Sequence, residues 1–408
     1  MNRDNTINRF YWASGACIII FLFLTLCGDI SNQQHVIAPS LKRLQTDFFC
    51  VLRYISERDP YNSPIYGLEE KPYFPIAYLL MYPFTLFFDY RNTSEIDCLY
   101  LTIPRIEATI FALVSLIMWV HSMARLCKKY STSKWFILLS MFSSCFLFSM
   151  IRGSYVTIST ACIMYFLYYY DLHDKKAIII SVLAISFASL LKVYPVVFAL
   201  LWFNKGNYKK IFQIAIVCLI VGILPFFFFK GGLDNIEYML RNITLQGTKF
   251  QSLLRPDRMG IISLAVQFNS FTHIQSELII VLAKITNYLL LLVSVALIFM
   301  TKKKWLQLLL MSCLSAVFPV SGFIYNLTLL IPVFVMILGY YYKEMPFVTL
   351  NTTVILFFLS MVPIQIVYHG FSLSQVGNNL AGILLWLYTI ITAIKTINNE
   401  KLETKILK

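Results

Sequence analysis

The chain has 408 residues, of which 58% are hydrophobic and only 13% are charged, and its mean hydropathy is +0.70. Soluble domains are about 45–50% apolar and about 25% charged, so this composition excludes a soluble enzyme, a disordered chain and a secreted disulfide scaffold. The net charge of +14 does not require a nucleic-acid partner, because most Lys and Arg lie in short loops, where membrane topology and anionic headgroups explain them.

Apolar segments follow one another along almost the whole chain. They are residues 10–28, 73–88, 106–126, 135–151, 155–170, 177–203, 211–229, 278–300, 305–319, 323–341, 347–368 and 378–397. Because a helix needs about 20 apolar residues to cross a bilayer, the length allows about 12 spans, with a range of roughly 11–13. We predict an all-α polytopic membrane protein whose residues 1–408 form a single integral membrane domain.

Two long polar stretches, 29–72 and 230–277, separate these segments. Lys and Arg cluster in the other loops, and such clusters stay cytoplasmic, so we predict that both polar stretches lie on the outer face. After residue 211, successive loops can be assigned alternately to the two faces of the membrane in agreement with the Lys and Arg clusters. Before it, either 73–88 is re-entrant and 177–203 is a broken hairpin, or the charge rule fails once.

The first outer loop contains an amphipathic pattern. Its apolar residues stand at i, i+3, i+4 and i+7, and they are Phe48, Val51, Leu52 and Ile55. This spacing predicts a helix on the membrane surface. Asp47 stands at its start, and the turn Asp59-Pro60-Tyr61 follows it, since a residue before proline avoids the α region.

Asp47 has two possible roles, which do not exclude each other. One role is a helix cap, because a carboxylate at the first turn of a helix satisfies free N–H groups. A carboxylate held at the lipid–water boundary can also act as a general base on a sugar hydroxyl group.

Ionisable residues inside apolar segments are costly and often functional. Lys192 lies deep in such a segment, and Pro195 breaks the helix beside it, which suits an anionic ligand such as a lipid phosphate. Arg152 precedes Gly153 between the apolar segments 135–151 and 155–170. This interruption is either a plain turn with a surface arginine or part of a functional site. Glu107 opens a span, where it can reach water.

Residues on the predicted outer side form a further group of candidates. Tyr325 and Asn326 follow Pro319 in a short connection that is either a tight loop or a place to hydrogen-bond a sugar. In the second outer loop, Arg255 and Arg258 are either solvated or able to bind a lipid diphosphate or an acidic glycan.

Motifs for nucleotide or metal chemistry are absent from the sequence. There is no GxxxxGK[ST], no GxGxxG after a strand, no HExxH, no GxSxG and no DxD. We therefore predict no metal and no cofactor.

Several short motifs together resemble a known family. They are Asp47 through Tyr61, Lys71-Pro72-Tyr73-Phe74-Pro75, Arg152-Gly153-Ser154-Tyr155, Leu191-Lys192-Val193-Tyr194-Pro195 and Pro319-Val320-Ser321-Gly322. In this order the chain resembles the GT-C superfamily of membrane glycosyltransferases, and more narrowly glycosyltransferase family 87, which includes polyprenol-phosphate-mannose-dependent mannosyltransferases. The family usually has Gly-Gln or Gly-Asn where this chain has Gly153-Ser154, and a histidine near Tyr325-Asn326. Both differences bear on which sugar the donor would carry.

The resemblance implies a GT-C-like bundle and an inverting, metal-independent transfer of a mannose-like hexose. The donor is a polyprenyl-phosphate sugar, the acceptor is a glycan or glycolipid, and the active site is on the outer face of the plasma or inner membrane, among membrane lipids. Asp47 in loop 29–72 is the implied catalytic base. The implied donor-phosphate ligands are Lys192, Arg152, Arg255 and Arg258, and the substrate-binding residues are Asp59, Tyr61, Tyr194, Tyr325 and Asn326.

Two other functions remain compatible with the sequence. A polysaccharide polymerase that uses lipid-diphosphate oligosaccharides also has about a dozen spans, and its working loop would be 230–277. A transporter of lipid-linked sugars would show inverted repeats and mid-span carboxylates, and neither is evident in the sequence.

Overall fold

The computed structural model describes residues 3–27, 44–204, 206–249, 258–272, 277–319, 322–363, 367–368 and 371–406. These residues are almost entirely helical, and one small antiparallel pair of strands joins β1 (Val367–Tyr368) to β2 (Phe371–Ser372). The all-α class predicted from the composition is therefore confirmed. The chain divides into two compact units, which we describe separately.

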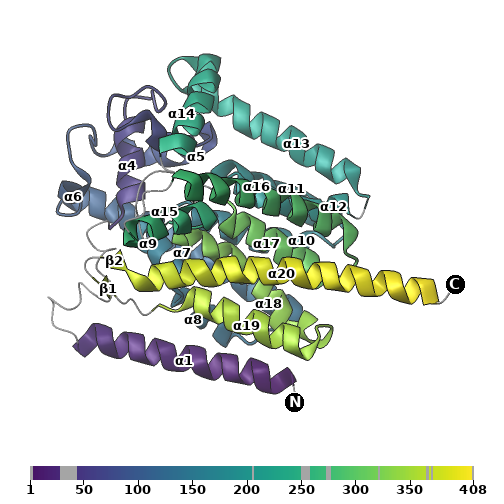
Figure 1. Ribbon diagram of the computed structural model, residues 1–408. Coiled ribbons are helices and arrows are strands. Elements are labelled where there is room, and N and C mark those ends of the chain that lie inside the picture. The colour runs from purple at the N-terminus through teal and green to yellow at the C-terminus, as the bar shows by residue number, and fades with distance from the viewer. Residues whose placement is uncertain are drawn as a thin grey trace. The chain divides into compact units, whose positions relative to one another are not determined.

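The first unit comprises residues 1–36, 124–145 and 254–408. Its helices are α1 (Arg3–Cys27), α8 (Trp135–Met141), α15 (Ile261–Thr272), α16 (Glu277–Met300), α17 (Lys304–Val317), η7 (Ile324–Leu330), α18 (Ile331–Gly339), η8 (Tyr341–Lys343), α19 (Phe347–Met361) and α20 (Leu373–Ile406). Helix α17 forms its core, because every residue from Trp305 to Val317 is buried. Helices α16 and α20 both pack against α17, and the three can be followed in Figure 1.

The second unit comprises residues 37–123 and 146–253. It contains α4 (Thr46–Ile55), η1 (Leu68–Glu70), α5 (Pro75–Met81), η2 (Tyr82–Leu86), α6 (Glu95–Cys98), α10 (Val156–Tyr169), α11 (Lys175–Leu191), η3 (Tyr194–Ala199), α12 (Leu200–Phe203), α13 (Tyr208–Ile223), η4 (Leu224–Phe228), η5 (Gly232–Asp234) and α14 (Asn235–Lys249), with most of α7 (Thr102–Tyr130) and α9 (Ser144–Arg152). Small residues let α10 and α11 pack closely, and the Ser159 hydroxyl donates to the Ala188 carbonyl at 3.0 Å.

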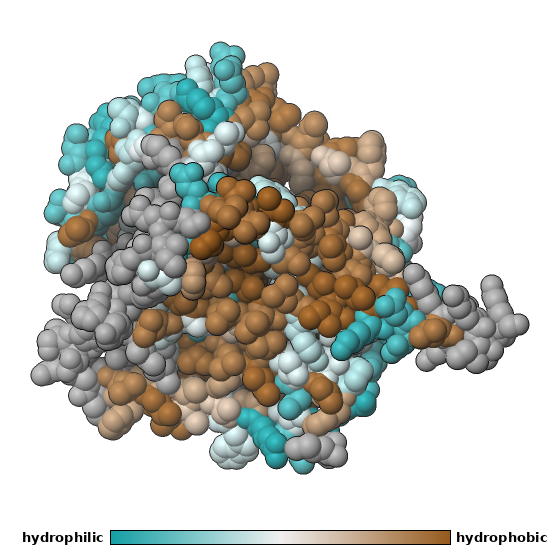
Figure 2. Space-filling model, viewed as in Figure 1, coloured by the Kyte–Doolittle hydropathy of each residue, from teal (hydrophilic) through white to brown (hydrophobic). Residues whose placement is uncertain are grey.

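Five helices in the described part of the chain are long and apolar enough to cross a membrane: α1, α7, α13 with η4, α16 and α20. The bent pair of α8 and α9 adds a sixth if it counts as one span. Side chains on the outward face of α13 are apolar and exposed, as Figure 2 shows, and Phe212 and Leu219 are each more than 60% exposed. The chain is thus a helical membrane protein, and the full set of about 12 spans stays a prediction.

Two of the expected segments are interrupted. Segment 73–88 yields only α5 and η2, which together cover residues 75–86, fewer than a simple span needs. Segment 177–203 is broken after Leu191, because Lys192 adopts an extended conformation and Pro195 starts a new helical turn without a backbone N–H. The predicted break at Lys192 is confirmed.

The predicted amphipathic helix is present as α4, and it ends at Ile55, before the turn at Asp59. Its apolar face does not lie free for lipid, because Phe48, Leu52 and Ile55 are fully buried in the core of the second unit. The Phe48 ring packs against Phe84 and Phe111, with centroids 5.4 and 5.1 Å away. Such a phenylalanine stabilises a core by about 3–5 kcal/mol relative to alanine.

Helix α14 holds the rest of the early loop in place. The Asn242 side chain is fully buried and donates to the carbonyls of Tyr61 at 3.1 Å and Lys71 at 3.4 Å. The start of the predicted second outer loop therefore packs on the first outer loop within the second unit. Residues 258–272 of the same predicted loop belong to the first unit.

Candidate active site

The start of α4 is docked on the end of α9. Gln45 adopts a left-handed conformation, and its backbone N–H donates to the Ile151 carbonyl at 2.6 Å while its side chain donates to the Met150 carbonyl at 2.9 Å. The last carbonyls of a helix have no partner within the helix, so Gln45 supplies what α9 lacks. The residues that follow Gln45 and those that follow Ile151 are thereby brought together.

Helix α9 ends in a Schellman motif. The N–H of Ser154 donates to the Ser149 carbonyl at 3.0 Å and the N–H of Gly153 to the Met150 carbonyl at 3.2 Å, with Gly153 at a φ of +67°. This conformation favours glycine, since a side chain in the left-handed region is strained. The Arg-Gly pair quoted from the sequence is therefore a helix end that presents Arg152.

Asp47 and Arg152 meet where these two helix ends join. The Arg152 Nε donates to Asp47 Oδ1 at 3.0 Å, and Nη2 donates to the same oxygen. The two side chains are only 17% and 8% exposed, respectively. Asp47 lies at the positive end of the α4 dipole and Arg152 at the negative end of the α9 dipole, so both charges are favoured.

The second carboxylate oxygen of Asp47 is in a different state. Asp47 Oδ2 is buried, and no group in the described ranges donates a hydrogen bond to it. A buried acceptor without a donor is uncommon and calls for a functional reason. Asp47 is not the residue that caps α4, because the N-cap position belongs to Gln45. Arg152 orients the carboxylate through one oxygen, and the second oxygen has no hydrogen-bond donor in the described ranges. This arrangement suits a carboxylate that receives a proton.

Lys192 belongs to the same cluster. Its side chain lies over the Tyr73 ring, with Nζ 4.7 Å from the centroid, and Nζ donates to the Tyr73 hydroxyl at 3.4 Å. The charges of Asp47 and Arg152 both act on the Lys192 ammonium group, Asp47 stabilising it and Arg152 opposing it. The site thus joins one carboxylate and two cations.

Tyr73 was not among the candidates from the sequence, although its motif was quoted. Its backbone is fixed at both ends, because its N–H donates to the Tyr78 hydroxyl at 3.3 Å and its carbonyl accepts from the Tyr61 hydroxyl at 3.0 Å. Its ring packs edge-on against Tyr155, with centroids 5.3 Å apart. Local aromatic content alone does not distinguish such a residue from an ordinary core tyrosine.

The other candidates of the second unit lie around this cluster in different ways. Tyr61 is fully buried, and its hydroxyl donates a hydrogen bond to the Tyr73 carbonyl. Burial raises the pKa of Tyr61 well above its ordinary value, so the hydroxyl keeps its proton. Tyr194 begins η3 and lies close enough to Tyr73 to act on it electrostatically. Asp59 stands in the turn after α4, with its Oδ1 buried.

The remaining candidates belong to the first unit. The backbone of Arg258 pairs with that of Phe323, and its guanidinium lies over the Phe323 ring at 5.3 Å. Tyr325 and Asn326 follow in η7 and are buried. Arg258, Tyr325 and Asn326 therefore gather around one turn, whereas Arg255 falls outside the described residues.

The comparison with known families decides the class. The family model of glycosyltransferase family 87 matches residues 72–332, more than half of the chain. The chain belongs to glycosyltransferase family 87. No curated protein matches it. As a family 87 member the protein is an enzyme that transfers a sugar, and the resemblance noted in the sequence is confirmed. The matched range includes Tyr73, Arg152 and Lys192 but begins after Asp47.

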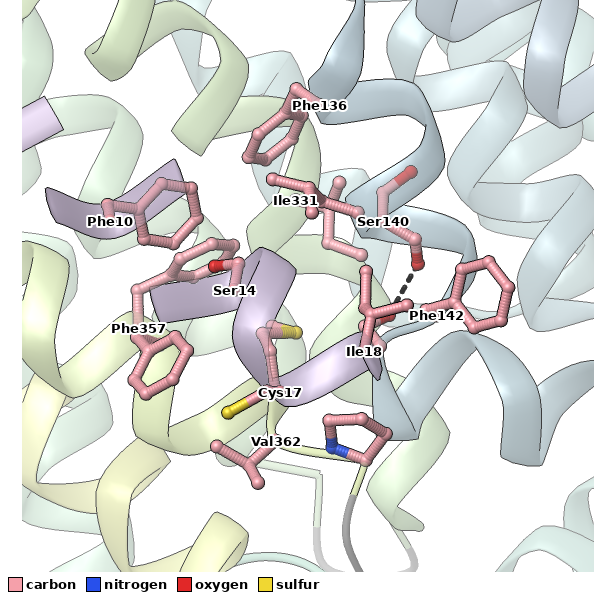
Figure 3. Close-up of a pocket in the computed structure, with 15 residues that line it drawn as sticks. Phe10, Ser14, Cys17, Ile18, Phe136, Ser140, Phe142, Ile331, Phe357 and Val362 are labelled. Atoms are coloured by element: carbon pink, nitrogen blue, oxygen red, sulfur yellow. Dashed lines mark hydrogen bonds between the residues drawn. The ribbon is translucent and has the colours of Figure 1, made fainter. Parts of the chain in front are cut away.

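The family 87 enzyme also has a small apolar pocket in its first unit, of about 40 Å³. Figure 3 shows Phe10, Ser14 and Ile18 of α1 opposite Phe136 and Phe357 around it. Few polar groups line it, and one of them, the Ser143 hydroxyl, already donates a hydrogen bond to the Ser140 carbonyl at 2.6 Å. Among the described residues, no carboxyl, amine or imidazole group lines this pocket, so its chemistry differs from that of the Asp47 cluster.

Gly153 provides a direct test of how the site is held together. A Cβ at this position would lie 2.4 Å from Gln45 Oε1 and 2.8 Å from Phe48 Cβ. We expect Gly153→Ala to destabilise the protein by about 1–3 kcal/mol through backbone strain, and further through this overlap. It also pushes the start of α4 away from α9, so transfer activity falls with the melting temperature.

Gly206 is the matched control for this substitution. It has nearly the same φ, +68°, but nothing lies within 4 Å of a Cβ built there. Gly206→Ala therefore keeps the strain and removes the overlap, and we expect it to retain activity. Equal loss of activity in both variants, measured in the same transfer assay, would show that docking of α4 on α9 is not what matters.

Proposed function

We propose that this family 87 enzyme transfers a mannose-like hexose from a polyprenyl-phosphate donor to a hydroxyl group of a glycan or glycolipid. The reaction inverts the anomeric centre, needs no metal ion and takes place on the outer face of the cell membrane. The observation that carries this proposal is the Asp47 carboxylate, oriented by Arg152 through one oxygen and open at the other, with Lys192 in electrostatic range.

In this mechanism Asp47 Oδ2 accepts the proton of the acceptor hydroxyl group. The acceptor oxygen becomes acidic as it bonds to the anomeric carbon, so its proton is transferred to the carboxylate late in the reaction. The bond from the anomeric carbon to the phosphate oxygen breaks on the opposite face, and polyprenyl phosphate leaves with the electron pair.

Lys192 is our proposed ligand for the phosphate that leaves. Negative charge grows on the phosphate as the bond breaks, and a preorganised cation stabilises this charge in a site that excludes water. The Tyr73 hydroxyl accepts a hydrogen bond from Lys192, so its own proton remains available for a phosphate oxygen. Arg152 is bound to Asp47 in this structure, so we assign it first to positioning Asp47 and only then to the phosphate.

The remaining candidates are proposed to contact sugars. Asp59 and Tyr194 lie in the same unit as Asp47, and Asp59 has a buried oxygen that suits a hydroxyl donor. Tyr325 and Asn326 are proposed as sugar ligands and Arg258 as a reserve phosphate ligand. Arg255 keeps that same proposed role from the sequence.

The experiment that tests the proposal uses the full chain in lipid nanodiscs. It offers radiolabelled mannose on polyprenyl phosphate, with octyl α-mannoside as the acceptor probe. We expect labelled disaccharide of inverted configuration, release of polyprenyl phosphate, and the same rate in excess EDTA. If no monosaccharide donor reacts but a lipid-diphosphate oligosaccharide is extended, the enzyme is a polymerase instead.

A further inference from the structure

A second feature of the second unit is a groove between η2 and the start of α7, with a volume of about 770 Å³. Its walls are apolar and consist of Pro83, Phe84, Phe87, Ile103, Ile106 and Ile110. Phe87 is 72% exposed and Ile106 is 54% exposed, although both are large and apolar. Helix α7 is long and apolar enough to cross a membrane, and exposed apolar side chains beside such a helix suit hydrocarbon better than water.

Among the described residues that line this groove, Glu107 is the one ionisable residue. Glu107 is only 5% exposed, so it does not extend to water as its place at the start of a span suggested. The Tyr90 hydroxyl donates to Oε2. Oε1 is buried, and within the described residues no group donates to it. An acidic group in an apolar groove, with one oxygen that lacks a hydrogen-bond donor, can bind a ligand that supplies such a donor.

The groove lies next to the candidate active site. The Phe84 ring, which lines the groove, packs against Phe48 with centroids 5.4 Å apart, and Phe48 directly follows Asp47 in α4. Phe48 also packs against Phe111 of α7, which directly follows the groove residue Ile110. Packed aromatic rings therefore connect the groove to the start of α4, which carries the carboxylate that we assign as the base.

We propose that this groove binds the acceptor as a lipid-linked sugar, with its hydrocarbon chain along the apolar walls and one sugar hydroxyl donating to Glu107 Oε1. This inference rests on the proposed function, because it assigns the acceptor to that reaction. An anionic donor does not suit the groove, since none of its described lining residues is a cation that could bind a phosphate. A neutral headgroup suits it, because a hydroxyl supplies the single donor that Oε1 lacks.

The test uses an alkyl glucoside with a photoreactive diazirine in its alkyl chain, added to the full chain in nanodiscs. We expect labelled peptides to map to residues 83–87 and 103–110. Ile106→Trp fills the groove and lowers the labelling. Ile117→Trp is the control, because Ile117 lies on the same helix at 64% exposure but does not line the groove, and it leaves the labelling unchanged.

A second set of variants tests the polar anchor. Glu107→Leu combined with Tyr90→Phe removes the carboxylate without leaving the tyrosine hydroxyl unpaired, and labelling falls about tenfold, as for one lost hydrogen bond to a charged group. Tyr90→Phe alone keeps Oε1 and therefore keeps the labelling. Equal labelling by an alkyl phosphate of the same length, or no effect of the double variant, overturns the proposal. Stronger labelling by an alkylammonium probe overturns it in favour of a cation site.

The outcomes also separate this proposal from the proposed function. Lys192→Met should lower the rate of sugar transfer by about 10²–10³-fold and leave the groove labelling intact. If labelling depends on Glu107 but no polyprenyl-phosphate donor reacts, the proposed function fails and only the binding of a sugar-bearing lipid stands. If transfer is normal in the groove variants, the groove does not hold the acceptor and the proposed function is unaffected.

Discussion

Asp47→Asn is expected to lower the rate of sugar transfer by about 10²–10⁴-fold, the usual contribution of a general base. Asparagine keeps the shape of the side chain, and its amide oxygen can still accept the hydrogen bonds of Arg152 that now end on Oδ1. It cannot accept a proton from the acceptor hydroxyl. The protein should therefore stay folded while its chemistry stops, and KM for the donor should change little.

Asp89 is the matched control for this prediction. Its carboxylate forms an ion pair with Arg91 at 2.8 Å, which has the same chemistry as the pair of Asp47 with Arg152 but is about half exposed. The Arg91 guanidinium lowers the pKa of Asp89. Exposed pairs of this kind contribute about 0–1 kcal/mol. Asp89→Asn should leave both transfer and the melting temperature unchanged.

The two variants need to be compared at equal folded fractions. Thermal unfolding in detergent gives the stability, and release of polyprenyl phosphate gives the rate. Full activity of folded Asp47→Asn would leave the carboxylate with a structural role only, that of joining α4 to Arg152. A loss of activity that simply follows a loss of stability would lead to the same conclusion.

Much of the fold could be predicted because the chemistry of the membrane limits the choices. Long apolar segments must be helical, since a helix satisfies its own backbone groups in lipid. The helix of the early loop was also predictable from the spacing of Phe48, Val51, Leu52 and Ile55. Its partner was not, because the same apolar face suits lipid and a protein core equally well, and in the structure the core occupies it.

The site could be predicted only in part, for a related reason. Lys192 is conspicuous because a charge in an apolar segment is costly, and Asp47 is conspicuous because it starts a helix. Their meeting with Arg152 depends on contacts more than 100 positions apart in the sequence, set by the left-handed turns at Gln45 and Gly153. No local pattern encodes such a contact.

Some charges are buried for structural reasons that the sequence does not reveal. Lys71 is fully buried, and its ammonium group donates to the carbonyls of Ser63 and Tyr66, which closes the turn before α5. Its type and setting differ little from those of Lys192. Only the partners distinguish the two, since backbone carbonyls surround Lys71 whereas a carboxylate and an arginine act on Lys192.

Lys192→Met is the second substitution for which we expect a large effect, a loss of about 10²–10³-fold in kcat, as found when one stabilising donor is removed. Methionine has a similar length and no charge. Lys192 is only partly buried, and methionine keeps the apolar contacts of the lysine stem, so the melting temperature should change little. Because the phosphate gains charge mainly in the transition state, the loss should appear in kcat rather than in KM.

Tyr73→Phe and Lys210→Met complete this experiment. Tyr73→Phe keeps the ring under Lys192 but removes the hydroxyl that Nζ contacts at 3.4 Å, so we expect a smaller loss of about tenfold, the value of one hydrogen bond to a charged group. Lys210 also lies over an aromatic ring, that of Trp202 at 5.0 Å, and it is not one of the residues that we assign to the candidate active site. Lys210→Met should keep wild-type kcat. If Lys192→Met and Lys210→Met behave alike, a lysine over an aromatic ring stabilises the fold at both positions, and another cation must bind the phosphate that leaves.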